Sequence, residues 1–204
     1  MKAKKGKLFV LALMLSCVLI PVVNHQEVFA NTRHENTKTE TKNIYTPNSV
    51  VHKGKKITFS QSAYNYYETK GVPWDTLVSR CNNISKEIKK KNVCVGPEFN
   101  GEDNLSSYIL GHNPGTMSRI ATLAVGDSIF VTDKNSKTFE YVVVDYANAE
   151  KSYNFVNGSG DLSDYFYYGG DKEAVLIQYC INHESHVYLA LPKEEMNLST
   201  YSKL

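Results

Sequence analysis

The chain has 204 residues, of which 42% are hydrophobic, 11% aromatic and 22% charged. This composition is typical of one or two folded domains and excludes a disordered or collagen-like chain. Its 23 basic and 21 acidic residues give a formal net charge of +2, but four of the lysines lie within the first thirty residues, so the remainder is nearly neutral. We therefore expect neither nucleic acid nor an anionic membrane surface as a partner.

The first thirty residues have the pattern of a secretory signal peptide. A cluster of lysines precedes an uncharged apolar run from Leu8 to Val23, and Ala30 is the small residue expected at a cleavage site. The apolar run is shorter than the roughly twenty residues that span a bilayer comfortably, although an uncleaved signal anchor stays open. The working part of the protein is therefore expected outside the cytoplasm, where disulfides persist and ATP is absent.

Residues 31–56 are rich in Thr, Asn and Lys and contain few large apolar side chains. Such a segment buries too little surface to offset its chain entropy, which predicts a flexible polar linker. From residue 57 to residue 204 the composition is globular, and the length suits one domain.

Apolar residues from Trp74 to Ile88 repeat at helical spacing. Pro73 suits the start of a helix and the lysines at 89–91 suit its end, so the pattern predicts a helix over 74–90.

After this helix the pattern changes to short runs of β-branched and aromatic residues, which predict strands over 93–95, 107–110, 128–132, 138–145, 174–181 and 186–191. Turn-forming residues at 133–137 and 182–185 predict two hairpins, so neighbouring strands are expected to be antiparallel. A short helix is predicted over 117–123. The fold class is therefore mostly β, a barrel or sandwich with two or three helices.

The connection from Tyr146 to Lys172 is long and carries glycines and aromatic residues. Loops of this length are usually functional or mobile. Its aromatic side chains fit two interpretations equally well, the wall of a substrate groove or a small core of the loop itself.

Three cysteines follow the signal peptide, and an odd number leaves at least one thiol without an intramolecular partner. A bridge between Cys81 and Cys94 would close a short loop and contribute on the order of 3 kcal/mol. Two buried thiols fit the sequence equally well. Cys180 stands near the end of the predicted strand 174–181, where a side chain can reach a barrel mouth.

A cysteine nucleophile needs a partner that moves protons near neutral pH, and histidine does this. The domain offers His112, His183 and His186. His112 follows Gly111 at the end of a predicted strand, where an Asn-Pro pair and a second glycine turn the chain.

Residues 105–191 resemble the sortase family of cysteine transpeptidases. The Gly111-His112 pair ends one predicted strand, the Leu123-x-x-Gly126-Asp127 turn opens the next, and Cys180 ends a later strand, in the order of that family. The resemblance implies a closed or partly open β-barrel, to which the helix over 74–90 would be an extra N-terminal element.

The resemblance also implies an activity. Cys180 would attack a peptide bond in a sorting signal similar to Leu-Pro-x-Thr-Gly on an exported protein, and His112 would protonate the leaving amine. An amine from the cell wall or from a pilin would then resolve the thioester. The family works without an organic cofactor, although some members bind calcium, and it operates on the outer face of the membrane or in the wall of Gram-positive-type bacteria.

The sequence departs from the family at two places. The two threonines that usually precede the cysteine are absent, and Tyr179 stands immediately before Cys180. The family arginine after the cysteine is also absent. The resemblance places His186 at that position, and its imidazole would stabilise an oxyanion less well than the missing guanidinium. Arg119 could substitute if its short helix faces the site.

The residues expected to line the substrate groove are Tyr179, Tyr165, Tyr167 and Tyr168.

Two other functions remain open. The missing arginine also fits an accessory protein that keeps the barrel and binds a peptide but catalyses little. A metal site could use Cys180, His183, His186 and His112. Alternation of side chains along a strand argues against the metal site.

Overall fold

The computed structural model describes residues 44–63, 65, 74–165 and 172–196. The predicted signal peptide at 1–30 and residues 31–43 of the predicted linker lie outside this range. None of the helices in the described part of the chain is long and apolar enough to cross a membrane.

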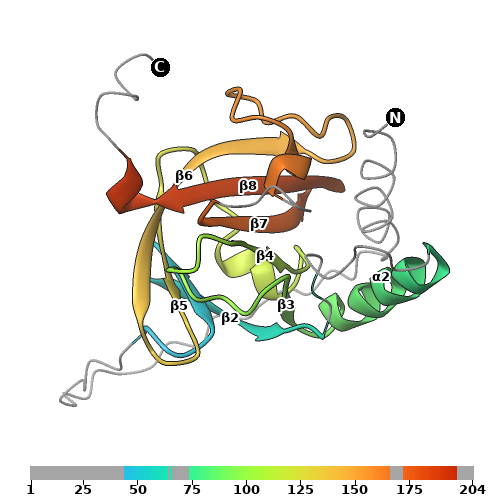
Figure 1. Cartoon of the computed structure of the whole chain (residues 1–204), viewed down its shortest axis with the longest axis horizontal. Helices are drawn as coiled ribbons and strands as arrows, with labels where there is room; N and C mark the ends of the chain where they lie inside the picture. The colour runs from blue at the N-terminus through green and yellow to red at the C-terminus, as the bar shows by residue number, and fades with distance from the viewer. Residues whose placement is uncertain (1–43, 64, 66–73, 166–171, 197–204) are drawn as a thin grey trace, which may run out of the picture.

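Eight strands form a closed barrel, which confirms the mostly β fold class (Figure 1). Around the barrel they follow the order β1 (Ser49–His52), β2 (Lys55–Gln61), β3 (Asn92–Val95), β4 (Ser106–Leu110), β7 (Ala174–Ile181), β8 (Glu184–Pro192), β6 (Thr138–Asn148) and β5 (Ser128–Thr132). The described chain also has the helix α2 (Trp74–Ile88) and three short 3-10 helices, η3 (Thr116–Arg119), η4 (Leu162–Tyr165) and η5 (Lys193–Glu195).

The barrel begins earlier than the sequence predicts. Residues 49–56, assigned to the linker, contain β1 and the start of β2, and β1 closes the barrel by pairing with β5. Val50 of β1 is completely buried in the interior. The prediction was wrong here because a four-residue strand leaves too short a pattern to stand out from polar neighbours.

Two pairs of neighbouring strands are parallel, β2 with β3 and β4 with β7, and the remaining pairs are antiparallel. The expectation of antiparallel neighbours therefore fails at these pairs. A parallel pair needs a crossover connection, usually a helix, and α2 lies on the connection between β2 and β3. The helix is thus part of the barrel connectivity.

The described apolar residues form two clusters, one on each side of the sheet. One cluster takes residues from all eight strands and fills the barrel interior, and we call this side of the sheet the inner face. The other joins α2 and the segment 149–165 to β3, β4, β6, β7 and β8, and we call that side the outer face. Along β7, Ile177 and Tyr179 belong to the inner cluster and Leu176 to the outer one, as the alternation of a strand requires.

The segment that follows β6 is folded onto the outer face. Asp145 is completely buried, and its carboxylate accepts hydrogen bonds from the backbone N–H groups of Tyr146, Asn157 and Ser159. One buried carboxylate therefore fixes the start of the long connection. For this connection the sequence left two interpretations open, a groove wall or a small core.

Two local predictions needed correction. The short helix expected over 117–123 is the 3-10 helix η3, which ends at Arg119. The second hairpin turn, expected over 182–185, comprises only Asn182 and His183, both with positive φ, as a tight two-residue turn requires. Glu184 and Ser185 are consequently paired residues of β8.

Candidate functional site

The parallel pairing of β4 and β7 brings the Gly-His element to Cys180. Leu110 lies opposite Gln178 in the register, so the next residues of both strands continue side by side. The N–H of Gly111 donates to the carbonyl oxygen of Gln178 at 3.2 Å, and the side-chain amide of Asn113 donates to the carbonyl oxygen of Cys180 at 2.7 Å. These two bonds flank His112 and fix its backbone beside Cys180.

Gly111 is required because of the space around it. A Cβ atom at this position would lie 2.1 Å from Oδ1 of Asn92 and 2.7 Å from Cγ of Met117. Only glycine therefore lets the chain leave β4 between β3 and η3 and place His112 at the strand end.

Cys180 is buried with 6% of its surface exposed, and it forms no disulfide. Because Tyr179 and Ile177 lie on the inner face, alternation places the side chain of Cys180 on the outer face. On β4, Tyr108 and Leu110 belong to the outer cluster, and continuing this alternation beyond the strand places His112 on the same face.

His112 is partly buried, and desolvation by this burial lowers the pKa of its imidazole, with a further decrease from the nearby Lys89. Its Nε2 atom is buried and has no hydrogen-bond partner among the described residues. The imidazole is therefore mostly neutral at neutral pH, as a proton acceptor for a thiol must be.

The second described cysteine differs in its surroundings. Cys94 is a free thiol on β3 inside the barrel, completely buried, and burial raises its pKa to about 12. A thiol with this pKa is not a nucleophile at neutral pH. The Cys81–Cys94 bridge that the sequence left open is not formed, because Cys94 faces the interior as a free thiol.

The Gly126-Asp127 turn joins three segments at this end of the barrel. Gly126 has a positive φ of 91°, and Asp127 accepts hydrogen bonds from the N–H of Ala124 and from His52 Nε2, both at 3.0 Å. Partial burial opposes ionisation of Asp127, but these bonds and one from Lys53 lower its carboxyl pKa overall. The element is therefore an anchor for the β1–β2 hairpin.

His186 does not lie beside Cys180. In the β7–β8 ladder it pairs with Tyr179, so its side chain is on the inner side of the sheet. It stacks on Tyr146 with ring centroids 5.9 Å apart and approaches Glu184 at 3.7 Å. The assignment of His186 to the family arginine position was therefore wrong in its geometry.

Arg119 points to another part of the barrel. Its Nη1 donates to the carbonyl oxygen of Lys56 on β2 at 3.4 Å. In the barrel order β3 and β4 separate β2 from β7, so Arg119 is not in position to act beside Cys180.

The expected groove tyrosines are placed differently. Tyr179 is completely buried on the inner face and stacks on Tyr188 with ring centroids 5.3 Å apart. Tyr165 packs edge-on against Phe155 in the outer cluster, which supports the small-core interpretation of its segment. Tyr167 and Tyr168 lie outside the described residues.

Sequence reasoning missed three buried polar residues on the outer face: Gln178 and Ser185, which neighbour Cys180, and Tyr108, which donates a hydrogen bond to Gln178. Gln178 stands two residues before Cys180 and Ser185 lies directly opposite it across the hairpin. Alternation alone would have identified Gln178, but Ser185 depends on the length of the turn.

No group of three or more His, Cys, Asp or Glu side chains in the described part of the chain is placed to hold a metal ion. His183 is at the tip of the β7–β8 turn and His186 is on the inner side, so the four proposed metal ligands do not converge. The same holds for calcium as far as carboxylates are concerned, since no group of three or more of them is placed to hold it in this part of the chain.

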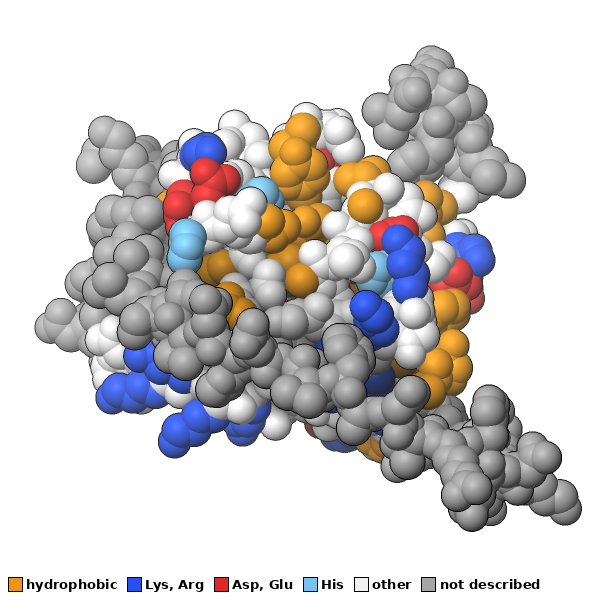
Figure 2. Space-filling view, turned by 180° about the vertical axis from the view of Figure 1, so that it is seen from behind, with side chains coloured by type: hydrophobic (Ala, Val, Ile, Leu, Met, Phe, Trp, Pro, Cys, Tyr) orange, Lys and Arg blue, Asp and Glu red, His pale blue; other side chains and the backbone are white. Residues whose placement is uncertain are grey.

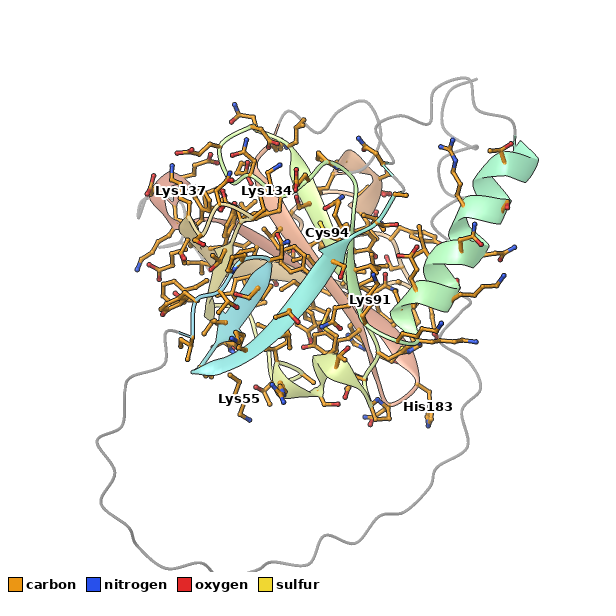
Figure 3. All side chains as sticks on the ribbon, turned by 90° about the horizontal axis from the view of Figure 1, so that it is seen from below. Lys55, Lys91, Cys94, Lys134, Lys137 and His183 are labelled. Atoms are coloured by element: carbon orange, nitrogen blue, oxygen red, sulfur yellow. The ribbon has the colours of Figure 1, made fainter. Side chains whose placement is uncertain are left out.

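The two ends of the barrel can be told apart by the residues that they carry. Figure 3 shows His183 and Lys55 at the end that carries Cys180, and Lys134 and Lys137 at the other end.

The face turned away in Figure 1 has an area of apolar side chains bordered by histidine and charged side chains (Figure 2).

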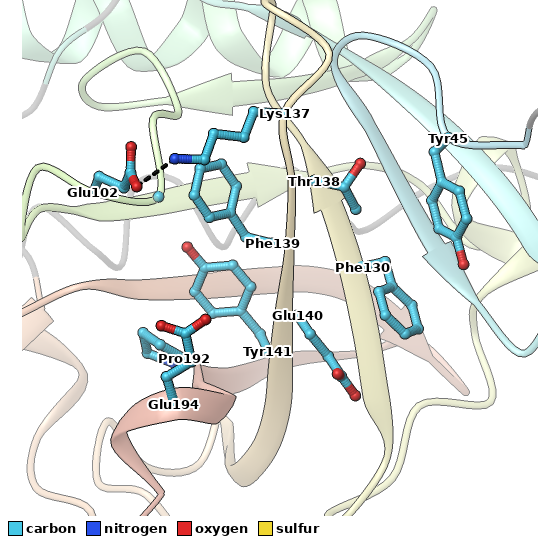
Figure 4. A pocket seen from close by; sticks show the side chains of 11 residues that line it. Tyr45, Glu102, Phe130, Lys137, Thr138, Phe139, Glu140, Tyr141, Pro192 and Glu194 are labelled. Atoms are coloured by element: carbon cyan, nitrogen blue, oxygen red, sulfur yellow. Dashed lines mark hydrogen bonds and ion pairs between the residues drawn. The ribbon is translucent and has the colours of Figure 1, made fainter.

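A half-open cavity of about 610 Å³ lies on the far half of the barrel, between Tyr45, Phe130, Phe139 and Tyr141 (Figure 4). Lys137 and Glu102 form an ion pair at its edge. These residues lie toward the barrel end opposite Cys180, so the cavity is separate from the cysteine and histidine.

No family model matches the chain, and no curated protein matches its sequence. Among solved structures it is similar to the sortase D5 transpeptidase of Clostridium perfringens, with a TM-score of 0.45 and 15% identity over 71% of this chain and 76% of that one. It is also similar to a mutant of sortase E from Streptomyces avermitilis, with a TM-score of 0.41 and 12% identity over 74% and 93% of the two chains. For the catalytic domain of B. anthracis SrtD the TM-score is 0.38 and the identity 11%, over 79% and 97% of the two chains. The structure of this chain is thus similar to those of three sortases, at low sequence identity.

Proposed function

We propose that this protein is an exported, sortase-like cysteine transpeptidase in which Cys180 is the nucleophile and His112 the general acid and base. One observation carries the proposal: His112 and Cys180 stand at adjacent ends of two parallel strands, tied by the bonds from Gly111 and Asn113. A thiol and an imidazole on one face of a sheet are the pair that acyl transfer through a thioester needs.

The chemistry runs in two halves. The imidazole of His112 takes the proton of Cys180, the thiolate adds to the carbonyl carbon of a substrate peptide bond, and a tetrahedral oxyanion forms. The C–N bond then breaks as His112 returns the proton to the leaving amine, which leaves a thioester on Cys180. An incoming amine adds to the thioester carbon and His112 accepts its proton. The C–S bond then breaks, the new amide leaves, and His112 returns the proton to the Cys180 thiolate.

The oxyanion has no assigned cationic partner. His186 lies on the inner side of the sheet and Arg119 is directed toward β2, so neither serves this role. Backbone N–H groups and uncharged side chains would have to supply the donors. Because removal of one oxyanion donor costs about 3–4 kcal/mol, we expect acylation to be slow compared with an enzyme that has the cation.

The substrate class follows from the family resemblance of the sequence. We propose sorting signals similar to Leu-Pro-x-Thr-Gly on exported proteins as acyl donors and an amine of the cell wall or of a pilin as acceptor. The predicted signal peptide places this reaction outside the cytoplasm, on the membrane surface or in the wall of a Gram-positive-type bacterium.

Intact-mass analysis tests the proposal. Residues 31–204 are incubated with a panel of sorting-signal peptides, and wild type is compared with Cys180→Ala, His112→Ala and Cys94→Ala. We expect an acyl adduct on wild type and on Cys94→Ala, where the inner-face thiol serves as a matched control, and none on Cys180→Ala. An adduct that survives in Cys180→Ala would contradict the assignment of the nucleophile.

A second candidate function is an accessory, peptide-binding protein that catalyses little. It is favoured because neither His186 nor Arg119, the two candidates for the family arginine, lies beside Cys180. In the same assay it predicts no adduct with any peptide while the folded protein still binds one, which isothermal titration with the Cys180→Ala variant would detect.

A further inference from the structure

Three uncharged polar side chains gather on the outer face beside Cys180. Tyr108, Gln178 and Ser185 belong to three adjacent strands, β4, β7 and β8, and their exposed fractions are 1%, 3% and 0%. Polar side chains buried to this extent must be hydrogen bonded, because an unmet donor or acceptor in the interior is costly.

These three side chains form a chain of hydrogen bonds in which each donates to the next. The hydroxyl of Tyr108 donates to Oε1 of Gln178, and Nε2 of Gln178 donates to the hydroxyl oxygen of Ser185. The chain therefore starts on β4, crosses β7 and ends on β8. Each bond polarises the next, so the hydroxyl at the end of such a chain is a stronger donor than an isolated one.

The end of the chain faces the nucleophile. Ser185 pairs with Cys180 in the antiparallel ladder, and side chains directly opposite in such a ladder have Cβ atoms about 4.5–5.5 Å apart. Ser185 accepts the hydrogen of the Gln178 amide, and its own O–H is a donor on the face that Cys180 shares.

A thiolate at Cys180 needs such a donor. The residue is almost completely buried, and an anion in a low-dielectric environment forms only when charges or hydrogen bonds compensate for lost hydration. His186 and Arg119, the two cationic candidates, are directed elsewhere.

We propose that Tyr108, Gln178 and Ser185 form a positioning chain that presents the Ser185 hydroxyl as a hydrogen-bond donor to the sulfur of Cys180. The neutral hydroxyl of Ser185 then stabilises the thiolate of Cys180 by a hydrogen bond. The inference rests on the proposed role of Cys180 as nucleophile. The titratable groups on the elements around this position are His112 beyond β4, Lys89 after α2, His183 in the turn and Tyr108 itself, whereas Glu184 and His186 of β8 lie on the inner side of the sheet.

The test measures the thiol without any peptide substrate. The rate of alkylation of Cys180 by iodoacetamide is followed against pH, with peptide mapping to separate it from the other cysteines, in wild type, Ser185→Ala and Ser185→Thr. In Ser185→Ala we expect the midpoint to rise by about one pH unit and the rate at pH 7 to fall about tenfold, and we expect Ser185→Thr to restore both toward wild type.

Ser106→Ala is the matched control. Ser106 is also completely buried, on β4 at the other end of the barrel, where its hydroxyl donates to the carbonyl oxygen of Lys172. Its removal costs a buried hydrogen bond without touching Cys180, so the alkylation midpoint should stay that of wild type.

Tyr108→Phe removes one oxygen atom only and tests the chain if Ser185→Ala does not fold. It should shift the midpoint in the same direction by a smaller amount. An unchanged midpoint in folded Ser185→Ala, or in folded Tyr108→Phe, would overturn the positioning chain. Because the assay needs no sorting peptide, a shifted midpoint without any acyl adduct would reject the proposed function and keep this inference, whereas an adduct with an unchanged midpoint would do the reverse.

Discussion

The two faces of the β7–β8 hairpin are built from alternating residues of the same two strands, yet one face is polar and the other aromatic. The outer face carries Cys180 with Gln178 and Ser185, a buried polar group beside His112. The inner face carries Tyr179 and Tyr188, stacked in the interior, with His186 at its edge. The comparison shows that the residues next to Cys180 in sequence face the interior, whereas the residues that share its face are two positions away or across the ladder.

The largest contrast is expected between two histidines, one on each face. His112→Ala should lower kcat/KM for acyl transfer about 10²–10⁴-fold, because it removes the proton carrier. His186→Ala should lower it less than about fivefold, because its contacts are a stacked ring and a partly exposed carboxylate. Rates are measured with a peptide that forms the adduct. Equal losses of kcat/KM in the two variants would contradict the assignment of acyl transfer to the outer face.

Substitutions on the inner face are expected to lower the stability of the fold more than the rate of acylation. Tyr179→Ala should lower the free energy of unfolding by about 3–5 kcal/mol, since it deletes a completely buried ring stacked on Tyr188. Tyr179→Phe keeps the ring and serves as the control, with a smaller loss and an unchanged rate of acylation. Urea unfolding measures both. A Tyr179→Phe variant that is stable but altered in peptide preference would indicate that Tyr179 lines the substrate groove after all.

The pH dependence sharpens the assignment of His112. Burial lowers the pKa of its imidazole below the ordinary value of 6.5. Below this pKa an imidazolium faces a protonated thiol and cannot accept its proton, so log kcat/KM should fall about one unit per pH unit on the acid side. We expect this decline to begin only below pH 6.5, in steady-state rates from pH 4.5 to 8. A decline already present at pH 7 would contradict a buried, neutral His112.

Glu173, at the barrel end opposite Cys180, is expected to make a smaller contribution, to the pH dependence of stability. Burial raises the pKa of Glu173 from 4.5 to about 7, with a contribution from Asp103 and against a hydrogen bond from Tyr141. Between these values the folded state holds a proton that the unfolded chain has released, so stability falls as pH rises from about 4.5 to 7. Glu173→Gln should therefore gain about 1–3 kcal/mol at pH 8 and little at pH 4.5. Thermal unfolding at both pH values measures the difference, and an equal effect at both would argue that the carboxyl titrates normally.

The smallest effect is expected at Arg119. Its side chain is on the surface with one long bond to a carbonyl oxygen. Arg119→Ala should change the free energy of unfolding by no more than about 0.5 kcal/mol and leave the rate of acylation almost unchanged. A loss comparable with that of His112→Ala would show that the guanidinium reaches the substrate.

The sequence predicted the fold class and most strands because β-branched runs such as Ala174–Ile181 carry a strong pattern. It also placed His112 and Cys180 correctly at strand ends. It missed β1, which is too short to carry a pattern, and β2 (Lys55–Gln61), for which no strand was predicted. It could not reveal which pairs are parallel, since that depends on where a crossover returns.

The misplacement of His186 follows from strand alternation and not from the length of the turn. The turn after β7 has His183 at a positive φ, where glycine is the usual residue, so its sequence carries no signal for a two-residue turn. A four-residue turn would place His186 opposite Ile181, and the observed turn places it opposite Tyr179, so it lies on the inner face in both cases. What the observed turn changes is Ser185, which becomes a strand residue directly opposite Cys180.

The strand order has a consequence for how the protein folds. The last strand, β8, lies between β6 and β7, and the first strand closes against β5. A growing or threading chain therefore keeps open sheet edges until its final segment arrives, and contacts of such high sequence separation form slowly. Cys180 and Ser185 belong to one hairpin with a two-residue turn, so this pair can form locally, before the distant pairings of β8 with β6 and of β1 with β5 close the barrel around it.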